Sequence, residues 1–471
     1  MRVRSASIHV VIFLFLLIPP ASAFPIRGYN ETPPDQWRQW GAVAWRYFQP
    51  GVAWDANTGL VYEAYGHHYF TNWGLASYIF SIMRAQQLGL VTATQYDLRY
   101  RVSKVLDFLS SQALSSGVPY LTYSADDGRP TTTQVTNAAD YGRLLIALYL
   151  LKQYLLQNGY ADLAPRIDAI VYNSTRAGLQ LSSQLQNDFY SFYVAQGFKL
   201  WGVDVSRFEQ EFQALQDGPF VDPSEMYGVE GIPSEVRVNP EVLVAGLLEL
   251  GGLESINNSL AWSVYKEFAG RVYSVLEARH ASTGQLTAWS EGGVDIGPGF
   301  VYEWIVDPEG RTWTILDPQL QLMWSMENGP NQSYGNTIVN RLPVAFTKIA
   351  FALYALFGTG YSKTLVDALG STYDSNGFME GLYETGGVDS THQVQTADMV
   401  LAAAAYATRY SSSTTVTSTS TTSAPTQAQA PGYVPPATAM MLLLMVVILL
   451  FPACMMAAFA VRPVRPRRQS S

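Results

Sequence analysis

Cysteine is almost absent from this chain of 471 residues, which contains a single one, Cys454, near its C-terminal end. Everything before that residue therefore has no disulfide and no thiol nucleophile, whether or not the compartment is oxidising. Because no covalent cross-link is available, stability must come from a hydrophobic core, and a chain of this length can bury a large one.

Several familiar catalytic motifs are missing as well. The sequence has no H-E-x-x-H, no G-x-S-x-G, no G-x-x-x-x-G-K-[ST] and no dinucleotide-binding fingerprint. Two of its five histidines, His67-His68, are adjacent, which is not the i, i+4 spacing of metal ligands on a helix. The D-x-D-D motif of terpene cyclases is absent, since Ala125-Asp126-Asp127 does not supply it. No metal ion and no organic cofactor is implied.

The N-terminus predicts an exported protein. Arg2 and Arg4 precede an apolar run, which is followed by prolines and the small-residue site Ala21-Ser22-Ala23. This is the order of charge, apolar core and cleavage site in a secretory signal peptide. Residues 1–23 are therefore expected to be removed, so that the mature chain begins near Phe24.

The C-terminus predicts a membrane anchor. Residues 411–436 consist mostly of Ser, Thr, Gln, Ala and Pro, a composition that cannot bury a core and is typical of an extended stalk. Residues 437–461 contain no charged side chain and are long enough to cross a bilayer as a helix. The four arginines of residues 462–471 favour a cytoplasmic tail. We expect a single-pass protein of the cell surface with its body outside the cell.

The charge of the body limits its partners. Six of the 29 basic residues lie in the two ends and no acidic residue does, which leaves 23 basic and 38 acidic residues and a net charge of −15. This balance argues against nucleic acid as a partner and suits a neutral ligand. An exported chain can also be glycosylated at its four N-x-S/T sequons, which begin at Asn30, Asn173, Asn257 and Asn331.

Residues 24–410 have mainly helical periodicity. The pattern predicts about ten helices, at residues 37–48, 71–87, 96–112, 137–157, 160–176, 206–215, 240–250, 259–280, 342–357 and 391–410. The long segments between some of them are rich in Gly, Pro, Trp and Tyr, at residues 49–70, 117–136, 217–239, 283–341 and 374–390. Long loops on a helical scaffold usually carry function. The sequence predicts one all-α domain, built as a ring of helical hairpins.

One long segment, "TGQLTAWSEGGVDIGPGFVYEW", concentrates carboxylates and aromatic rings. They are Glu291, Asp295, Glu303, Trp289, Tyr302 and Trp304. Glycoside hydrolysis needs one carboxylic acid to protonate the leaving oxygen and a second carboxylate to activate water or attack carbon. Tyr and Trp rings also stack on the apolar faces of sugars. The segment fits a polymeric sugar as the substrate, and it equally fits solvated loop charges beside buried aromatic residues.

Five segments of the body resemble one protein family in the same order along the chain. They are "TNWGLASYIFSIMRAQQLGL", "NAADYGRLLIALYLL", "NPEVLVAGLLELGG", "ARHASTGQLTAWSEGGVDIGPGFVY" and "GFMEGLYETGGVDSTHQVQTADMVLAAAAYAT". Together they make residues 37–408 similar to domain of unknown function 3131, a bacterial and archaeal family allied to glucoamylase-like (α/α)6 toroids. The resemblance implies an (α/α)6-like toroid with long aromatic-rich loops.

The resemblance also singles out individual residues. Glu291 is the expected general acid, or the base that positions water, and Glu384 in "EGLYETGG" is the expected second carboxylate. Asp140 is a third catalytic candidate, expected to line the pocket; the alternative is a salt bridge with Arg143. The residues expected to contact sugar are Trp289, Tyr302, Trp304, Tyr383, Glu241, Glu380 and Asp295. The alternative for the aromatic members is the core, where such side chains are more often found.

Two hypotheses about function follow. The first is a glycoside hydrolase or transglycosidase acting on extracellular or cell-envelope glycans, and the presence of Glu291 and Glu384 favours it. The second is a non-catalytic glycan-binding or envelope-structural protein on the same fold. Departures from the family's pattern favour this second hypothesis: Gly74 replaces an aspartate, Glu303 an asparagine, and Gln395 and Ala397 two further asparagines.

Overall fold

The structure is a computed structural model. It describes residues 32–92, 95–185, 189–218, 220, 232–233, 237–296, 299–306, 312–317, 322–325 and 342–415. Outside this part of the chain lie the expected signal peptide, the stalk beyond residue 415, the expected membrane span at 437–461, the tail at 462–471, and the sequons at Asn30 and Asn331. No helix among the described residues is apolar and long enough to span a membrane. The asparagines of the other two sequons, Asn173 and Asn257, are exposed.

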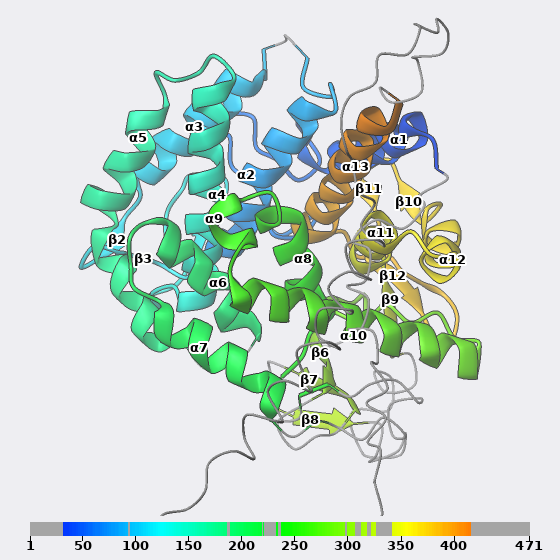
Figure 1. The fold of residues 1–471 in the computed structure, drawn as a ribbon. Coiled ribbons are helices and arrows are strands. Elements are labelled where there is room, and N and C mark those ends of the chain that lie inside the picture. The colour runs from blue at the N-terminus through cyan, green and yellow to red at the C-terminus, as the bar shows by residue number, and fades with distance from the viewer. Residues whose placement is uncertain are drawn as a thin grey trace, which may run out of the picture. The chain divides into compact units, whose positions relative to one another are not determined.

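Six helices stand side by side in a closed inner ring (Figure 1). They are α2 (Asn72–Gln87), α4 (Ala138–Gln157), α6 (Phe189–Leu200), α8 (Pro240–Leu250), α11 (Thr347–Phe357) and α13 (Val394–Thr415). Each packs against the next in chain order, and α13 closes the ring against α2. Their surfaces are largely buried because neighbours cover them on several sides, so these helices are apolar over most of their circumference.

Six further helices surround this ring. They are α1 (Pro34–Trp45), α3 (Leu98–Ser111), α5 (Ala164–Ala169), α7 (Ser206–Ala214), α10 (Leu260–Thr283) and α12 (Gly360–Leu369). In Figure 1 their labels lie around those of the inner six. Outer and inner helices alternate along the chain, and α1 packs on α13 to complete the circle. The predicted toroid of helical hairpins is confirmed.

The sequence missed two helices and misjudged two others. Helix α6 was missed because nine of its 12 residues are buried and it has no polar stripe to reveal a helical period. The short helix α12 was missed too. The helix predicted at 160–176 is broken: α5 ends at Ala169, and a π-helical turn, η2 (Ile170–Ser174), and a 3₁₀-helix, η3 (Arg176–Gln184), follow. The helix predicted from residue 342 begins only at Thr347.

The expectation of an all-α body with loops is wrong in one respect, because the long segments contain short antiparallel strands. The largest sheet has the order β5 (Glu291–Gly293), β6 (Phe300–Val306), β7 (Thr312–Asp317) and β8 (Leu322–Ser325). A second has the order β13 (Val388–Asp389), β12 (Gly381–Tyr383) and β9 (Val344–Phe346).

Three two-stranded ribbons and a few short helical pieces complete the described structure. The ribbons pair β1 (Tyr69–Thr71) with β4 (Thr122–Ser124), β2 (Leu114–Ser115) with β3 (Val118–Pro119), and β10 (Tyr373–Asp374) with β11 (Gly377–Phe378). The helical pieces are η1 (Arg46–Phe48), η4 (Leu215–Asp217) and α9 (Glu254–Asn257). Strands β1 and β9 run directly into α2 and α11, so their pairing holds the chain at the first turns of these two helices.

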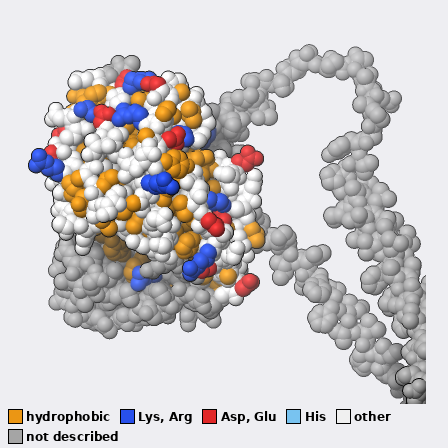
Figure 2. Space-filling view, turned by 90° about the vertical axis from the view of Figure 1, so that its left-hand side faces the viewer, with side chains coloured by type: hydrophobic (Ala, Val, Ile, Leu, Met, Phe, Trp, Pro, Cys, Tyr) orange, Lys and Arg blue, Asp and Glu red, His pale blue; other side chains and the backbone are white. Residues whose placement is uncertain are grey.

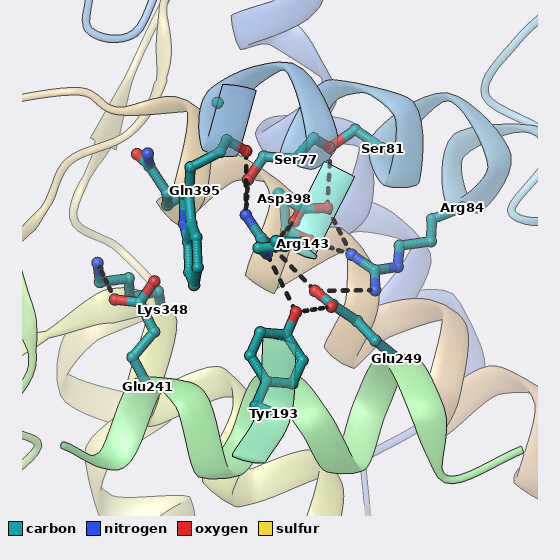
Figure 3. A network of polar contacts seen from close by, with 12 residues as sticks. Ser77, Ser81, Arg84, Arg143, Tyr193, Glu241, Glu249, Lys348, Gln395 and Asp398 are labelled. Carbon is teal, nitrogen blue, oxygen red and sulfur yellow. Dashed lines mark hydrogen bonds and ion pairs between the residues drawn. The ribbon is translucent and has the colours of Figure 1, made fainter. Parts of the chain in front are cut away.

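A network of charged side chains, centred on Arg143, crosses the axis of the ring (Figure 3). Arg143 from α4 donates to Glu249 on α8 over 2.9 Å and to Asp398 on α13 over 3.0 Å. Arg84 from α2 pairs with the same Asp398, and the Tyr193 hydroxyl from α6 donates to Glu249. Five of the six inner helices are thereby joined at one point, which we call the axial network.

The axial network is buried and balanced in charge. Its two arginines face two carboxylates, and Arg143 also donates to the hydroxyl of Ser77 and to the carbonyl of Trp73. The Trp73 ring covers the Arg143 guanidinium, with 4.5 Å between the ring centroid and Cζ. Buried charges are tolerated only when each finds such partners, so removal of one partner is strongly destabilising.

The outside of the ring is different in character. On the side that carries α3 and α5, basic and acidic side chains are interspersed without a patch of either sign (Figure 2). Two of the ion pairs on these helices are solvated: Arg99 with Asp162 over 2.6 Å, and Arg166 with Asp107 over 2.6 Å. Such exposed pairs contribute little to stability.

The axial network therefore predicts a contrast between two arginines that each bind an aspartate. Arg143→Met should lower the free energy of unfolding by about 3–5 kcal/mol, because Glu249 and Asp398 would share a single arginine in the core. Arg99→Met, the matched surface control, should change it little. The midpoint of guanidinium chloride unfolding at unchanged slope measures both. Equal losses in the two variants would contradict a special role for the network.

Candidate active site

A cavity of about 660 Å³ opens where the first turns of the six inner helices meet, and we call it the carboxylate cavity. Every inner helix contributes a lining residue from its N-terminal end: Trp73, Asp140, Tyr190, Glu241, Lys348 and Gln395. Helix N-termini present free N–H groups and partial positive charge. The volume is in the range of small-ligand sites.

Another cavity, of about 770 Å³, lies at the opposite end of the ring. Its lining comes from the C-terminal halves of α2, α4, α8 and α13 and from the start of α10. The one acidic residue in that lining is Glu249, which already belongs to the axial network. Because the carboxylate cavity combines several acidic groups with aromatic walls, we place the candidate active site there.

Strand pairing places Glu291 in the wall of this cavity. Glu291 of β5 lies directly opposite Tyr302 of β6, so both side chains project from the same face of the sheet. Phe300 and Trp304 follow the same alternation, and all four residues line the cavity. The residue between them, Glu303, projects from the other face into the core, where Val344 N–H donates to it.

The half-buried Glu291 is the most strongly perturbed acid whose pKa falls near neutrality. Burial first, and then the charge of Glu241, raises its pKa to about 8. The Tyr190 hydroxyl and the Lys348 ammonium oppose this rise, and the charge of Asp140 adds to it. Tyr190 is close enough to influence Glu291, although its hydroxyl does not complete a hydrogen bond of ordinary geometry. Glu291 therefore carries a proton at neutral pH.

Glu241 and Lys348, which lie side by side in Figure 3, both bind the strand that carries Glu291. The two side chains are buried and form an ion pair of 2.6 Å. Lys348 also donates to the backbone carbonyl of Glu291, and Glu241 accepts a hydrogen bond of 2.9 Å from the neighbouring Ser290. Glu241 thus lines the cavity as expected, but its contacts make it a positioning residue.

Asp140 lies in the first turn of α4. Its N–H is capped by the Asn137 side chain over 2.9 Å, and its half-buried carboxyl lines the cavity. Burial, followed by the charge of Glu63, raises its pKa to about 7. The charges of Glu291 and Asp140 both raise the pKa of Tyr302, after burial, which connects the two acids electrostatically. The expected alternative, a salt bridge with Arg143, is not formed, since Arg143 pairs within the axial network.

Glu63, Tyr190 and Lys348 are among the residues of this cavity that sequence reasoning missed. Glu63 lies in a segment predicted as a loop, and its carboxylate is tied to Gln395, which is 332 positions away. Tyr190 lies on the helix that was missed, and Lys348 near a helix start that was misplaced. One signal was available in the sequence. Gly74 stands where the family's pattern has an aspartate, next to Trp73, which lines the cavity.

The family model of DUF3131, described as a protein of unknown function, matches residues 39–410, which is most of the chain. The chain belongs to the DUF3131 family. No curated protein matches it. Among the described residues of this DUF3131 protein, no group of three or more His, Cys, Asp or Glu is arranged to hold a metal ion. The absence of a cofactor stays a prediction.

Solved structures with a similar fold have low sequence identity to this DUF3131 chain. A putative glucoamylase from Bacteroides caccae has a TM-score of 0.57 and 14% identity, over 79% of this chain and 94% of that one. The endo-β-1,2-glucanase from Chitinophaga pinensis, in complex with sophorotriose and glucose, has values of 0.56 and 11%, over 80% and 93%. The endo-β-1,2-glucanase from Talaromyces funiculosus with sophorose has values of 0.51 and 10%, over 81% and 87%. These likenesses establish the fold.

The DUF3131 structure does not bring Glu384 together with Glu291. Glu384 is absent from the lining of the carboxylate cavity and instead receives two hydrogen bonds from the Arg279 guanidinium, one of them 2.8 Å long. Trp289 Nε1 donates to it over 3.2 Å, and the Arg279 guanidinium lies over the buried Trp289 ring. Glu384 and Trp289 therefore lie outside the carboxylate cavity, where their contacts with Arg279 are those of a structural ion pair.

Three more expected sugar contacts also lie outside this cavity. The Tyr383 hydroxyl donates to Asp295 over 2.7 Å, and Asp295 accepts from both the N–H and the hydroxyl of Ser390. These bonds join two loops. Glu380 is fully buried, where it accepts from Thr396. Of the expected sugar contacts, Tyr302, Trp304 and Glu241 line the cavity of this DUF3131 protein.

The raised pKa of Glu291 predicts how pH acts on stability. The ordinary value is 4.5, so the folded protein binds this proton more tightly, and the Glu291 contribution to stability is lost as pH rises from about 5 to 8. Glu291→Gln cannot ionise, so the variant does not lose this stability. The thermal midpoint of the variant minus that of the wild type should therefore be larger at pH 8 than at pH 5. Glu211→Gln, a partly exposed control on α7, should show no such difference, and the same null result for Glu291→Gln would contradict the raised pKa.

Proposed function

We propose that this protein is a glycoside hydrolase whose reaction takes place in the carboxylate cavity. The observation that supports this most is a protonated Glu291 facing the same space as a second, ionisable acid, Asp140. Glycosidases need such a pair, in which one carboxyl group is kept neutral and the other is free to ionise. The pairing replaces the one first expected between Glu291 and Glu384.

The two acids take complementary roles in this proposal. Glu291 donates its proton to the glycosidic oxygen as the bond to the anomeric carbon breaks, which releases one sugar as an alcohol. Asp140, ionised, removes a proton from the attacking water or bonds to the anomeric carbon itself. Glu241 and Lys348 keep β5 in place, so that the acid is held at a fixed position.

The walls of the cavity suit a carbohydrate. Phe300, Tyr302 and Trp304 project from one face of β6, and aromatic rings pack on the apolar faces of sugar rings. The structural neighbours include two endo-β-1,2-glucanases and a putative glucoamylase, which supports a glucan as the substrate class. The signal peptide, stalk and membrane span expected from the sequence support a substrate outside the cell.

The proposal predicts turnover of at least one glucan from a panel with α-1,4, β-1,2, β-1,3 and β-1,4 linkages, measured as new reducing ends. Glu291→Gln and Asp140→Asn should each lower kcat by about 10²–10⁴-fold, because each removes a proton-transfer group. The surface control Glu267→Gln should leave kcat unchanged. Unaltered kcat in Glu291→Gln would remove Glu291 from the mechanism.

The same pair predicts a narrow pH profile. Activity should rise as Asp140 ionises, through about pH 7, and fall as Glu291 ionises, above about pH 8. The dependence of kcat/KM on pH measures both limbs. A profile that stays flat from pH 5 to 9 would contradict the roles given to these two acids.

Glu384→Gln separates the proposed pair from the pair first expected. It should lower the thermal midpoint, because Arg279 loses its partner, while turnover per folded molecule stays at the wild-type level. If no glucan is turned over but glucans still bind, the second hypothesis, a non-catalytic glycan-binding protein, is favoured instead.

A further inference from the structure

We infer that Glu63 and Gln395 form a subsite in the carboxylate cavity that binds hydroxyl groups of an uncharged sugar unit. The inference rests on the proposed function in taking a glycan as the ligand, and it adds the residues that recognise one of its units. Neither residue was expected to bind sugar from the sequence. Four features of the structure support it: the anchoring of Glu63, the space left by Gly74, an unpaired oxygen on Gln395, and the local charge.

The Glu63 carboxylate is anchored at the first turn of α2. One of its oxygens, Oε2, accepts hydrogen bonds from the N–H of Thr71, over 2.8 Å, and from its hydroxyl, over 3.1 Å. The other, Oε1, accepts from Gln395 Nε2 over 2.6 Å. Thr71 is itself the cap of α2, so the carboxylate is fixed to the end of a helix that the axial network holds. Each carboxylate oxygen has about two acceptor sites, so Thr71 fills those of Oε2, whereas Oε1 keeps one site that can receive a ligand hydroxyl.

Gly74 makes room for this arrangement. A Cβ atom at position 74 would lie 2.2 Å from Glu63 Oε2 and 2.9 Å from its Cδ. Any side chain at this position would therefore displace the Glu63 carboxylate. The glycine is needed for the space it leaves, since its backbone conformation is that of an ordinary helix.

Gln395 carries an acceptor with no partner. Gln395 lines the cavity, and only 9% of its surface is exposed. Its Oε1 has no hydrogen-bond partner among the described residues. An unmade hydrogen bond of a buried polar group costs about 1–3 kcal/mol. A ligand hydroxyl that donates to this oxygen would remove that cost. Beside it, Glu63 Oε1 offers one further acceptor site, so the two residues together suit neighbouring hydroxyl groups.

The charges around the subsite suit a neutral ligand. Glu63 and Asp140 are close enough for the charge of Glu63 to raise the pKa of Asp140. Among the described residues, two cations line the cavity: Lys348 is paired with Glu241, and the Arg237 guanidinium lies over the Trp304 ring, with 4.5 Å between Cζ and the ring centroid. A carboxylate or phosphate placed beside Glu63 and Asp140 would face two acidic groups and be repelled. The subsite therefore favours uncharged hexose units over uronic acids.

The test measures binding to the full-length protein in a Glu291→Gln background, so that hydrolysis does not interfere. Isothermal titration calorimetry uses four neutral gluco-oligosaccharides, with α-1,4, β-1,2, β-1,3 and β-1,4 linkages, and tetragalacturonate as the charged probe. Glu63→Ala should weaken binding of the best neutral ligand by about 10-fold or more, because a hydrogen bond to a charged group is lost. Tetragalacturonate should not bind detectably, and affinity for it equal to that for the neutral ligands would overturn the charge argument.

Gly74→Ala is the sharper variant, since it keeps every polar group and only forces the Glu63 side chain to move. It should weaken binding about as much as Glu63→Ala, and it should have no further effect once Glu63 is already Ala. Gly360→Ala is the matched control, because a Cβ there, in the first turn of α12, meets open space. Glu63→Ala with Gly74→Asp returns a carboxylate to the same space and should recover part of the affinity.

Failure of this inference can be told apart from failure of the proposed function. Glucan binding that is unchanged in Glu63→Ala, Glu63→Gln and Gly74→Ala would overturn the subsite, whatever the wild type hydrolyses. Binding that depends on Glu63 in a protein without turnover would uphold the subsite and overturn the catalytic proposal. Absence of binding by every oligosaccharide would overturn both. Glu63→Gln keeps the side-chain volume, so its result stands even if Glu63→Ala unfolds.

Discussion

The ion pairs of Arg143 across the axis of the ring are the contact on which the rest of the site depends. Helices α2, α4, α6, α8 and α13 each contribute a polar side chain to one buried cluster, and Arg143 reaches Glu249 and Asp398 at once. Hydrophobic packing alone leaves helices free to slide, whereas hydrogen bonds between buried charges require one geometry. Because the cluster fixes the helices relative to each other, their first turns present a defined set of side chains to the carboxylate cavity.

At those first turns, two electrostatic effects compete. The N-terminal ends of helices favour negative charge, but loss of water favours the neutral acid. Burial is the larger effect for Asp140, in the first turn of α4, and for Glu291, which lines the same cavity from β5. Glu241 lies a few residues from the same kind of helix end but has Lys348 as a direct partner. In this cavity, Glu241 has a cationic partner, whereas Glu291 and Asp140 form no ion pair of that kind with any described residue. The paired acid positions the site, and the other two are those proposed to act in it.

The sequence allowed the toroid to be predicted, because most helices keep a polar face and a clear period. It did not reveal α6, because nine of its 12 residues are buried and no polar face marks its period. For the site, resemblance led to Glu291, and the alternation of β6 explains why Glu303 beside it is elsewhere. Glu384 looked suitable as the second catalytic carboxylate, because its partner Arg279 lies 105 positions away and no local sequence pattern indicates the ion pair. Glu63 was overlooked for the same reason: its role depends on Gln395 and on a side chain that Gly74 lacks.

The position of the axial network also limits how a polymer can meet this protein. Trp73 lines the carboxylate cavity and lies against Arg143, while Arg84 and Glu249 line the cavity at the other end of the ring. Among the described residues, these side chains fill the space between the two cavities, so a polymer chain cannot pass through the toroid. In the proposed reaction, a long glycan must insert its tip or lie across a single entrance, and the released product must leave by the same opening.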